Sequence, residues 1–246
     1  PILAIGRGSN LLVSDRGFDG LVIHMAQGFG EMTFEGLTVV AGAGAPLPRV
    51  ARGSVDAGIA GLEFFVGVPG SVGGAVRQNA GCFGVETRDR MTKATIVDIG
   101  QRREFEATPD ELEMSYRHSN VEPDWVVVSA TFEGTSDDVA GSKDELREIT
   151  RWRKENQPGG TLNAGSVFKN PEGISAGALI DQAGLKGHSI GGVSVSEKHA
   201  NFFVAKSDAS SSDVRALIFE VRDLVEARAG VRLEPEIQMV GFDDDH

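Results

Sequence analysis

The chain has 246 residues, 40% of them hydrophobic and 24% charged, a composition typical of a globular protein with one large domain or two ordinary ones. Its net charge of −12 argues against non-specific nucleic-acid binding, and no apolar run approaches the roughly 20 residues of a membrane helix. The single cysteine, Cys82, excludes an internal disulfide and is interpreted as a small buried side chain, which fits a cytoplasmic location. We expect a monomer that associates with neither nucleic acid nor membrane.

A strand predicted at residues 3–5 leads into a first glycine-rich loop. A strand that opens into such a loop offers several backbone N–H groups, which is how a diphosphate is bound. The loop lacks the dinucleotide fingerprint of Rossmann folds, because Leu11 stands where the third glycine belongs. A hairpin turn explains the same residues, so both interpretations stay open. The candidate cofactor-binding residues of this loop are Gly6, Arg7, Gly8, Ser9, Asn10 and Leu11.

A second glycine-rich loop follows strands predicted at 21–23 and 37–41 and an amphipathic helix that begins near Pro46. The residues around Pro69 carry no charge and have small side chains. An ordinary buried loop has the same composition, but two such loops in one domain favour a site that surrounds an extended cofactor. The candidate residues of this second loop and of the similar stretch after it are Pro69, Gly70, Ser71, Gly73, Gly74, Ala75, Asn79, Ala80 and Gly81.

An arginine, Arg117, lies between strands predicted at 95–99 and 126–132. Its five fixed donors suit a carboxylate or a flavin carbonyl, and a surface ion pair is the alternative. Residues 134–142 are predicted to form a linker and 143–156 a charged helix, and the main domain boundary is predicted at the glycines that follow Pro158.

The stretch Asn163–Pro171 places a flexible turn before the hydroxyl of Ser166, followed by a cation and an amide. Lys169 and Asn170 suit an anionic, hydrogen-bonding substrate, although a tight turn has similar composition. Helices are predicted at 175–183 and from Ser210 to Gly230, and strands at 201–205 and 237–240. Lys198 belongs to a local group of cations, and the tail 243–246 is expected to fray.

Several common catalytic signatures are absent from the sequence. There is no phosphate-binding GKS or GKT loop and no Gly-x-Ser-x-Gly elbow, and the five histidines are too scattered to predict a metal site. We therefore expect neither a simple hydrolase nor a metalloenzyme.

Seven segments in order resemble the UDP-N-acetylenolpyruvoylglucosamine reductase family, which makes UDP-N-acetylmuramate for bacterial peptidoglycan. They are GRGSNLLVSDRGFDGLVI, GLEFFVGVPGSVGGAVRQNAGCFG, SYRHSN, AGSVFKNP, AGALIDQAGLKG, VSEKHANF and LEPEIQMVG. The compact link between SYRHSN and AGSVFKNP resembles the shorter type of this family, which lacks a substrate-capping loop. The resemblance also implies a nucleotide-binding segment ahead of Pro1.

The resemblance implies an α+β protein, with an FAD-binding fold of the vanillyl-alcohol-oxidase type followed by a smaller α/β substrate-binding domain. The implied domains are an FAD-binding domain at 1–157, a substrate-binding domain at 158–232, and a C-terminal strand at 233–246 that returns to the first domain. FAD would lie across the two glycine-rich loops, with Asn79–Gly81 near its isoalloxazine ring. NADPH would reduce FAD, and the reduced flavin would pass a hydride to C3 of UDP-N-acetyl-3-O-(1-carboxyvinyl)-glucosamine.

The resemblance also implies roles for individual residues. Arg117 matches the catalytic arginine, Ser166 the proton donor and Glu236 the catalytic glutamate. Lys169, Asn170 and Lys198 are implied to contact the sugar or the diphosphate. Hydride addition at C3 builds negative charge on C2 and the neighbouring carboxylate, and this demand agrees with a cation, a hydroxyl and an acid at the site.

Two alternatives stay open. A different flavin oxidase or dehydrogenase would share the N-terminal half without a UDP-sugar site, and it would not be thermally stabilised by a UDP-sugar. A truncated, non-catalytic nucleotide-binding module would lose no measurable property in the variant Ser166→Ala.

Overall fold

The computed structural model describes residues 1–137 and 139–242 and divides into two compact units. The first unit contains Pro1–Gly8 and Gly20–Trp152. The second contains Ser9–Asp19 and the chain from Arg153 onward. The short segment Ser9–Asp19 therefore packs with the C-terminal part of the chain, although the residues before and after it in sequence belong to the first unit.

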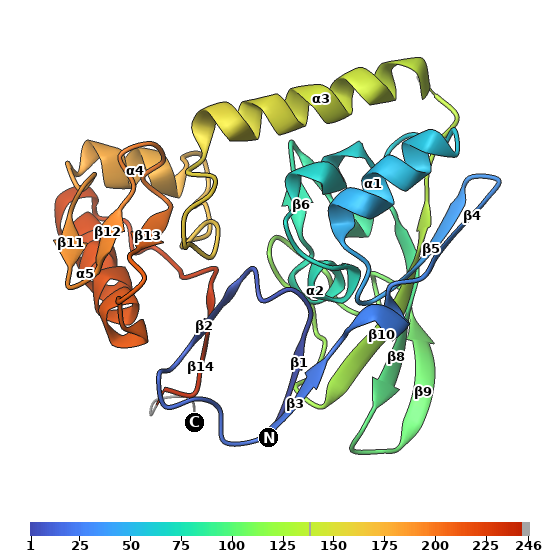
Figure 1. Cartoon of the computed structure of the whole chain (residues 1–246), viewed down its shortest axis with the longest axis horizontal. Helices are drawn as coiled ribbons and strands as arrows, with labels where there is room; N and C mark the ends of the chain where they lie inside the picture. The colour runs from blue at the N-terminus through green and yellow to red at the C-terminus, as the bar shows by residue number, and fades with distance from the viewer. Residues whose placement is uncertain (138, 243–246) are drawn as a thin grey trace. The chain divides into compact units, whose positions relative to one another are not determined.

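The first unit is built on an antiparallel sheet of five strands, counted over the described residues, in the order β4-β5-β10-β8-β9 (Figure 1). The strands are β4 (Met32–Glu35), β5 (Thr38–Gly42), β8 (Met91–Asp98), β9 (Arg103–Ala107) and β10 (Trp125–Glu133). The central strand β10 pairs with β8 along most of its length and with β5 from Ser129 to Glu133, and a bulge between Val127 and Ser129 interrupts its pairing with β8. Buried side chains such as Phe132 and Ile96 join this sheet to the core.

Helices and short strands cover this sheet. They are β1 (Ile2–Ile5), β3 (Leu21–His24), η1 (Gln27–Phe29), α1 (Leu47–Asp56), η2 (Glu63–Gly67), α2 (Val72–Gln78), β6 (Gly81–Cys82), β7 (Val85–Glu86) and η3 (Thr87–Asp89). Strands β1 and β3 form a parallel pair, and α2 packs against β10. The backbone of α2 lies close to Ala43, the residue after β5: a Cβ at Gly73 would lie 3.0 Å from that of Ala43, so glycine permits this approach.

The second unit has an antiparallel sheet of β11 (Ser189–Ile190), β12 (Val193–Val195) and β13 (Phe203–Ala205). Helices α4 (Ala176–Gln182) and α5 (Ser211–Ala229) pack together, and α5 also contacts β11 and β12 (Figure 1). The Ser210 hydroxyl accepts from the Asp213 N–H, and this capping box begins α5. Gly230, with φ +69°, ends it. Strand β2 (Leu11–Val13) pairs in parallel with β14 (Gln238–Val240).

The predicted segments agree with many of these elements but differ from the structure in several places. Strands β4 and β9 were not predicted, and Cys82, predicted to be buried, is only partly buried. The second glycine-rich loop contains the helix α2, because its small residues pack closely on the sheet. Helix α3 (Val139–Asn156) starts four residues before the predicted Lys143 and includes part of the predicted linker. The prediction that residues 243–246 fray lies outside the described residues. No helix in the described part of the chain is both long and apolar enough to cross a bilayer.

Candidate active site

Gly6, at the start of the first glycine-rich loop, and residues of the second loop line a cleft of the first unit. The strand β1 forms one wall of this cleft, and the N-terminal part of α2 forms another. Its lining includes Gly6, Ser71, Gly73, Gly74, Arg77 and Trp125. The cleft thus combines glycine backbone, one hydroxyl group, one cation and apolar side chains. Such a lining suits a long ligand with both polar and apolar parts.

The space around the glycines of the cleft indicates whether FAD would fit there. A Cβ at Gly6 would lie 1.9 Å from the Ser71 hydroxyl oxygen, so any larger residue would force the Ser71 side chain to move. At Gly74, by contrast, the nearest atom to a new Cβ is 3.8 Å away, which leaves room for a ligand. These residues fit the group that the glycine-rich loops predict. Arg7 is exposed and Gly8 has φ +64°.

The predicted stretch Asn79–Gly81 contacts Arg117 within the first unit. The Arg117 guanidinium donates through Nη2 to the Gly81 carbonyl at 3.0 Å, and its Nη1 lies 3.7 Å from Glu86 Oε1. Its side chain is 18% exposed, so this ion pair is largely shielded from water. The structure therefore places the predicted catalytic arginine next to a predicted cofactor-binding segment.

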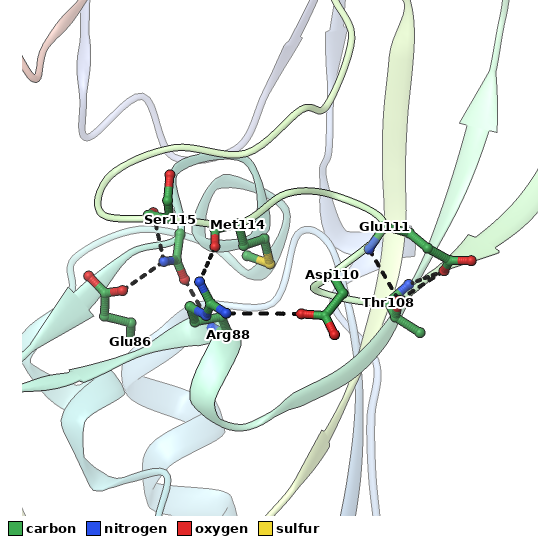
Figure 2. A network of polar contacts seen from close by, with 8 residues as sticks. Glu86, Arg88, Thr108, Asp110, Glu111, Met114 and Ser115 are labelled. Carbon is green, nitrogen blue, oxygen red and sulfur yellow. Dashed lines mark hydrogen bonds and ion pairs between the residues drawn. The ribbon is translucent and has the colours of Figure 1, made fainter.

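The side chain of Asn79 is used within the protein. Its amide nitrogen donates to Glu86 Oε2 and to the Ser115 carbonyl, both at 2.8 Å, and its oxygen accepts from the Arg88 N–H. Asn79 is fully buried. Figure 2 shows Glu86, Ser115 and Arg88 in this network of polar contacts.

In the second unit, Ser166 begins an extended segment that is held on both sides. Ser166 forms a β-bridge with Phe202, and the Val167 N–H donates to the Asn201 carbonyl at 2.9 Å. The buried Asn201 side chain accepts from the Phe168 N–H at 3.0 Å and donates to the Phe168 carbonyl at 2.8 Å. These contacts fix the backbone on which the predicted proton donor lies.

Glu236 lies on the other side of the same segment. Its N–H donates to the Val167 carbonyl at 2.8 Å, and Phe168 forms a β-bridge with Pro235. The Asn10 side chain donates to the Glu236 carbonyl at 3.0 Å. The structure thus brings together two predicted catalytic residues, Ser166 and Glu236, and one residue of the first glycine-rich loop.

The three predicted substrate-binding residues each have a separate protein partner. Lys169 forms a 2.6 Å ion pair with Glu234, and Lys198 donates to the Lys154 carbonyl at 2.7 Å. Asn170 accepts from the Ala176 N–H at the start of α4. None of these contacts joins two members of the predicted set.

The sequence did not identify several residues that shape these regions. Arg77 lines the cleft, Glu86 contacts Arg117, and Asn201 holds the segment of Ser166. Arg77 and Asn201 lie in the family-like segments GLEFFVGVPGSVGGAVRQNAGCFG and VSEKHANF, whereas Glu86 lies in none of the seven segments. No group of three or more metal-ligating side chains is found in the described ranges.

Comparisons with known proteins give a consistent result. A family model described as "FAD binding domain" matches residues 1–101, and one described as "UDP-N-acetylenolpyruvoylglucosamine reductase, C-terminal domain" matches residues 157–240. The UDP-N-acetylenolpyruvoylglucosamine reductases of Azorhizobium caulinodans and Paramagnetospirillum magneticum are 42% and 44% identical to the chain. Each alignment covers 98% of this chain and 78% of the relative.

A solved structure agrees with these matches. The crystal structure of UDP-N-acetylenolpyruvylglucosamine reductase from Thermus caldophilus is 34% identical and superposes with a TM-score of 0.87. The superposition covers 98% of this chain and 86% of that one. The predicted fold class, an FAD-binding domain followed by an α/β substrate-binding domain, is confirmed.

Proposed function

The chain belongs to the UDP-N-acetylenolpyruvoylglucosamine reductase family, and we propose that Arg117, Ser166 and Glu236 carry its reaction. It is an FAD-dependent oxidoreductase that uses NADPH to reduce UDP-N-acetyl-3-O-(1-carboxyvinyl)-glucosamine to UDP-N-acetylmuramate in peptidoglycan synthesis. The proposed location is the cytoplasm, which suits a chain with one cysteine.

The pairing of Glu236 with Val167 is the observation that carries the proposed roles. It places an acid beside the segment of a hydroxyl residue, with one hydrogen bond of 2.8 Å between their backbones. Val167 and Phe168 are buried, whereas Ser166 and Glu236 are partly exposed. A rigid, buried backbone that carries accessible polar residues supports a catalytic role for them.

Arg117, Ser166 and Glu236 are proposed to have different roles in the reaction. FAD, when bound, would supply the transfer of a hydride from NADPH to C3 of the enol ether. Arg117 binds the substrate carboxylate and stabilises the negative charge that develops there. Ser166 donates a proton to C2, which completes the addition of two hydrogens across the double bond. Because an aliphatic hydroxyl is a weak acid, Glu236 and ordered water restore the proton of Ser166.

The proposal also covers the remaining predicted residues. Lys169, Asn170 and Lys198 are proposed to contact the sugar nucleotide, and their protein partners hold them in fixed positions for this role. The Gly6–Leu11 and Pro69–Ala75 segments, with Asn79, Ala80 and Gly81, are proposed to surround FAD.

The domain limits 1–157, 158–232 and 233–246 are likewise a proposal. The two family matches, which end at residue 101 and begin at residue 157, support a boundary near Gln157. The proposed return of the C-terminal strand to the FAD-binding domain relies on the parallel pairing of β14 with β2, which lies within residues 1–157, although both strands belong to the second compact unit.

A visible spectrum followed by an NADPH oxidation assay tests this function. We expect a yellow protein that oxidises NADPH rapidly only when the enolpyruvyl substrate is present, with UDP-N-acetylmuramate as the product. A flavoprotein that is not stabilised thermally by the UDP-sugar would instead favour an oxidase or dehydrogenase of different specificity. A purified protein that remains colourless when FAD is added would falsify the proposal.

A further inference from the structure

The hairpin formed by β6 and β7 holds both ends of the Arg117 guanidinium. Gly81 and Glu86 are directly paired across this hairpin. The Gly81 carbonyl accepts from Nη2 at 3.0 Å, and the Glu86 carboxylate lies 3.7 Å from Nη1. The paired residues Gly81 and Glu86 therefore fix the plane of the Arg117 guanidinium. The orientation of this plane determines how a substrate carboxylate must lie in order to bind it.

Glu86 is itself held by a buried residue. Asn79 donates to its second carboxylate oxygen at 2.8 Å, and Asn79 also donates to the Ser115 carbonyl. The N–H groups and carbonyls of Ser115 and His118 bond to each other, which closes the tight turn that carries Arg117. The chain Asn79–Glu86–Arg117 thus connects the end of α2 both to the arginine side chain and to its backbone turn.

A second set of contacts attaches the same turn. Arg88 donates from its side chain to the Met114 carbonyl, and its backbone N–H donates to the Asn79 oxygen (Figure 2). Arg88 also lies 4.0 Å from Asp110, which is almost fully exposed and adds little. The turn of Arg117 is therefore fixed to the β6–β7 hairpin and the adjoining η3 by several independent contacts.

Unusual backbone conformations are concentrated in this region. Among the described residues, five that are not glycine have positive φ, and four of them are Asn79, Phe83, Glu113 and Arg117. Such conformations are unfavourable for residues with side chains and persist where surrounding contacts enforce them, often at functional sites. The fifth, Arg102, lies apart from this region in the turn between β8 and β9, so the other four mark the surroundings of Arg117.

We propose that Glu86, held by Asn79, is a positioning residue that orients Arg117 toward the substrate carboxylate. The proposal rests on the role of Arg117 in the proposed function. Glu86 is 24% exposed, so its carboxylate is partly shielded and acts at short range. It does not touch the reacting atoms; it acts through the guanidinium and through the turn that Asn79 fixes.

The variants Glu86→Gln and Asn79→Ala test this proposal. Glutamine keeps the size of the side chain, but it loses the charge and cannot accept from both Asn79 and Arg117 through two oxygens. We expect the rate of flavin reoxidation by the enolpyruvyl substrate to fall about 10- to 100-fold, because a small misplacement of a binding group has effects of this size. Reduction of the flavin by NADPH should stay unchanged in Glu86→Gln. Glu86→Asp, which keeps the charge, should recover part of the rate.

Two further measurements separate positioning from general damage. Affinity for the enolpyruvyl substrate should fall in Glu86→Gln, whereas affinity for UDP-N-acetylglucosamine, which has no carboxylate for Arg117, should not change. The matched control is Thr108→Ala, which removes an exposed hydrogen bond to Glu111 in the same unit and does not touch the arginine (Figure 2). This control should leave both half-reactions unchanged.

The outcomes distinguish this inference from the function on which it rests. If Arg117→Ala reoxidises at the normal rate, the role of Arg117 is wrong, and the inference with it. If Arg117→Ala is slow but Glu86→Gln and Asn79→Ala reoxidise like the unmodified protein, only the positioning role is overturned. Equal losses in both half-reactions, or equal losses of affinity for both ligands, would show a structural role and would also overturn it.

Discussion

Asn10 and Glu236 are 226 positions apart in sequence, and the side chain of Asn10 contacts the backbone of Glu236 in the second unit. The Asn10 side chain donates to the Glu236 carbonyl at 3.0 Å, and the Gln238 N–H donates to the Asn10 carbonyl at 3.0 Å. These contacts join the first glycine-rich loop to the strand β14 immediately after the proposed catalytic glutamate. A residue predicted to bind the cofactor therefore also positions the backbone of an acid.

Replacing Asn10 should affect the substrate half-reaction more than the stability of the protein. The variant Asn10→Ala removes one hydrogen bond, which contributes about 0.5–1.5 kcal/mol to stability. We expect a modest loss in the free energy of unfolding and slower flavin reoxidation by the substrate. Stopped-flow rates normalised to bound FAD check this. Normal reoxidation in the FAD-bound variant would contradict the coupling.

Asn201 should contribute strongly to stability. Its buried amide pairs with both backbone groups of Phe168, so Asn201→Leu leaves a buried donor and a buried acceptor without this partner. Each unsatisfied buried group costs about 1–3 kcal/mol. Urea unfolding should show a loss within this range or above it. The exposed Asn163→Ala is the control and should lose less; equal losses in the two variants would count against the assigned role.

The contact between Gly6 and Ser71 predicts a loss of FAD that a second change can reverse. In Gly6→Ala the new methyl group would collide with the Ser71 hydroxyl, and the cleft between the two loops would deform. We expect a lower ratio of flavin to protein absorbance. The additional change Ser71→Gly removes the colliding atoms and should restore binding. Gly28→Ala, where a Cβ meets nothing within 4 Å, should bind FAD normally.

The lowered pKa of His199 should make the stability of the protein depend on pH. Burial of its ring lowers the pKa of His199 below the ordinary value of 6.5, the nearby charge of Lys186 lowers it further, and a backbone hydrogen bond partly opposes these effects. The unfolded chain therefore binds this proton at higher pH than the folded chain does. Acidification consequently favours unfolding, beginning as the pH falls through 6.5.

The variant His199→Gln should reduce this dependence. Between about pH 7.5 and pH 5.5 the unmodified protein should lose more unfolding free energy than the variant, because glutamine does not titrate. Denaturant titrations at the two pH values measure the difference. Parallel losses in both proteins would contradict a lowered pKa for His199.

Local sequence patterns predicted much of the fold. The helix α5 has a serine cap, an apolar stripe and a terminal glycine, and each signal was found in place. The strands β4 and β9 were missed because they are short and rich in polar residues, as in Arg103–Ala107. The helix α2 was taken for a loop because two glycines obscure its helical pattern, and its stability depends on packing against the sheet.

The site was predictable only where a residue type itself indicates chemistry. The glycine-rich loops, Arg117 and the hydroxyl of Ser166 had such signals. The contacts of Glu86 with Arg117 and of Asn201 with Phe168 join residues about 30 positions apart, and no periodicity encodes them. Their function is to hold other residues, so their identity follows from packing that only the folded chain shows.

Anaerobic stopped-flow measurement of the variant Ser166→Ala tests the central claim most directly. We predict that NADPH reduces its flavin at the normal rate, while reoxidation by the enolpyruvyl substrate slows by about 10²–10⁴-fold, as expected for loss of a general acid. Reoxidation at the rate of the unmodified protein, with UDP-N-acetylmuramate still formed, would contradict the claim that Ser166 supplies the proton.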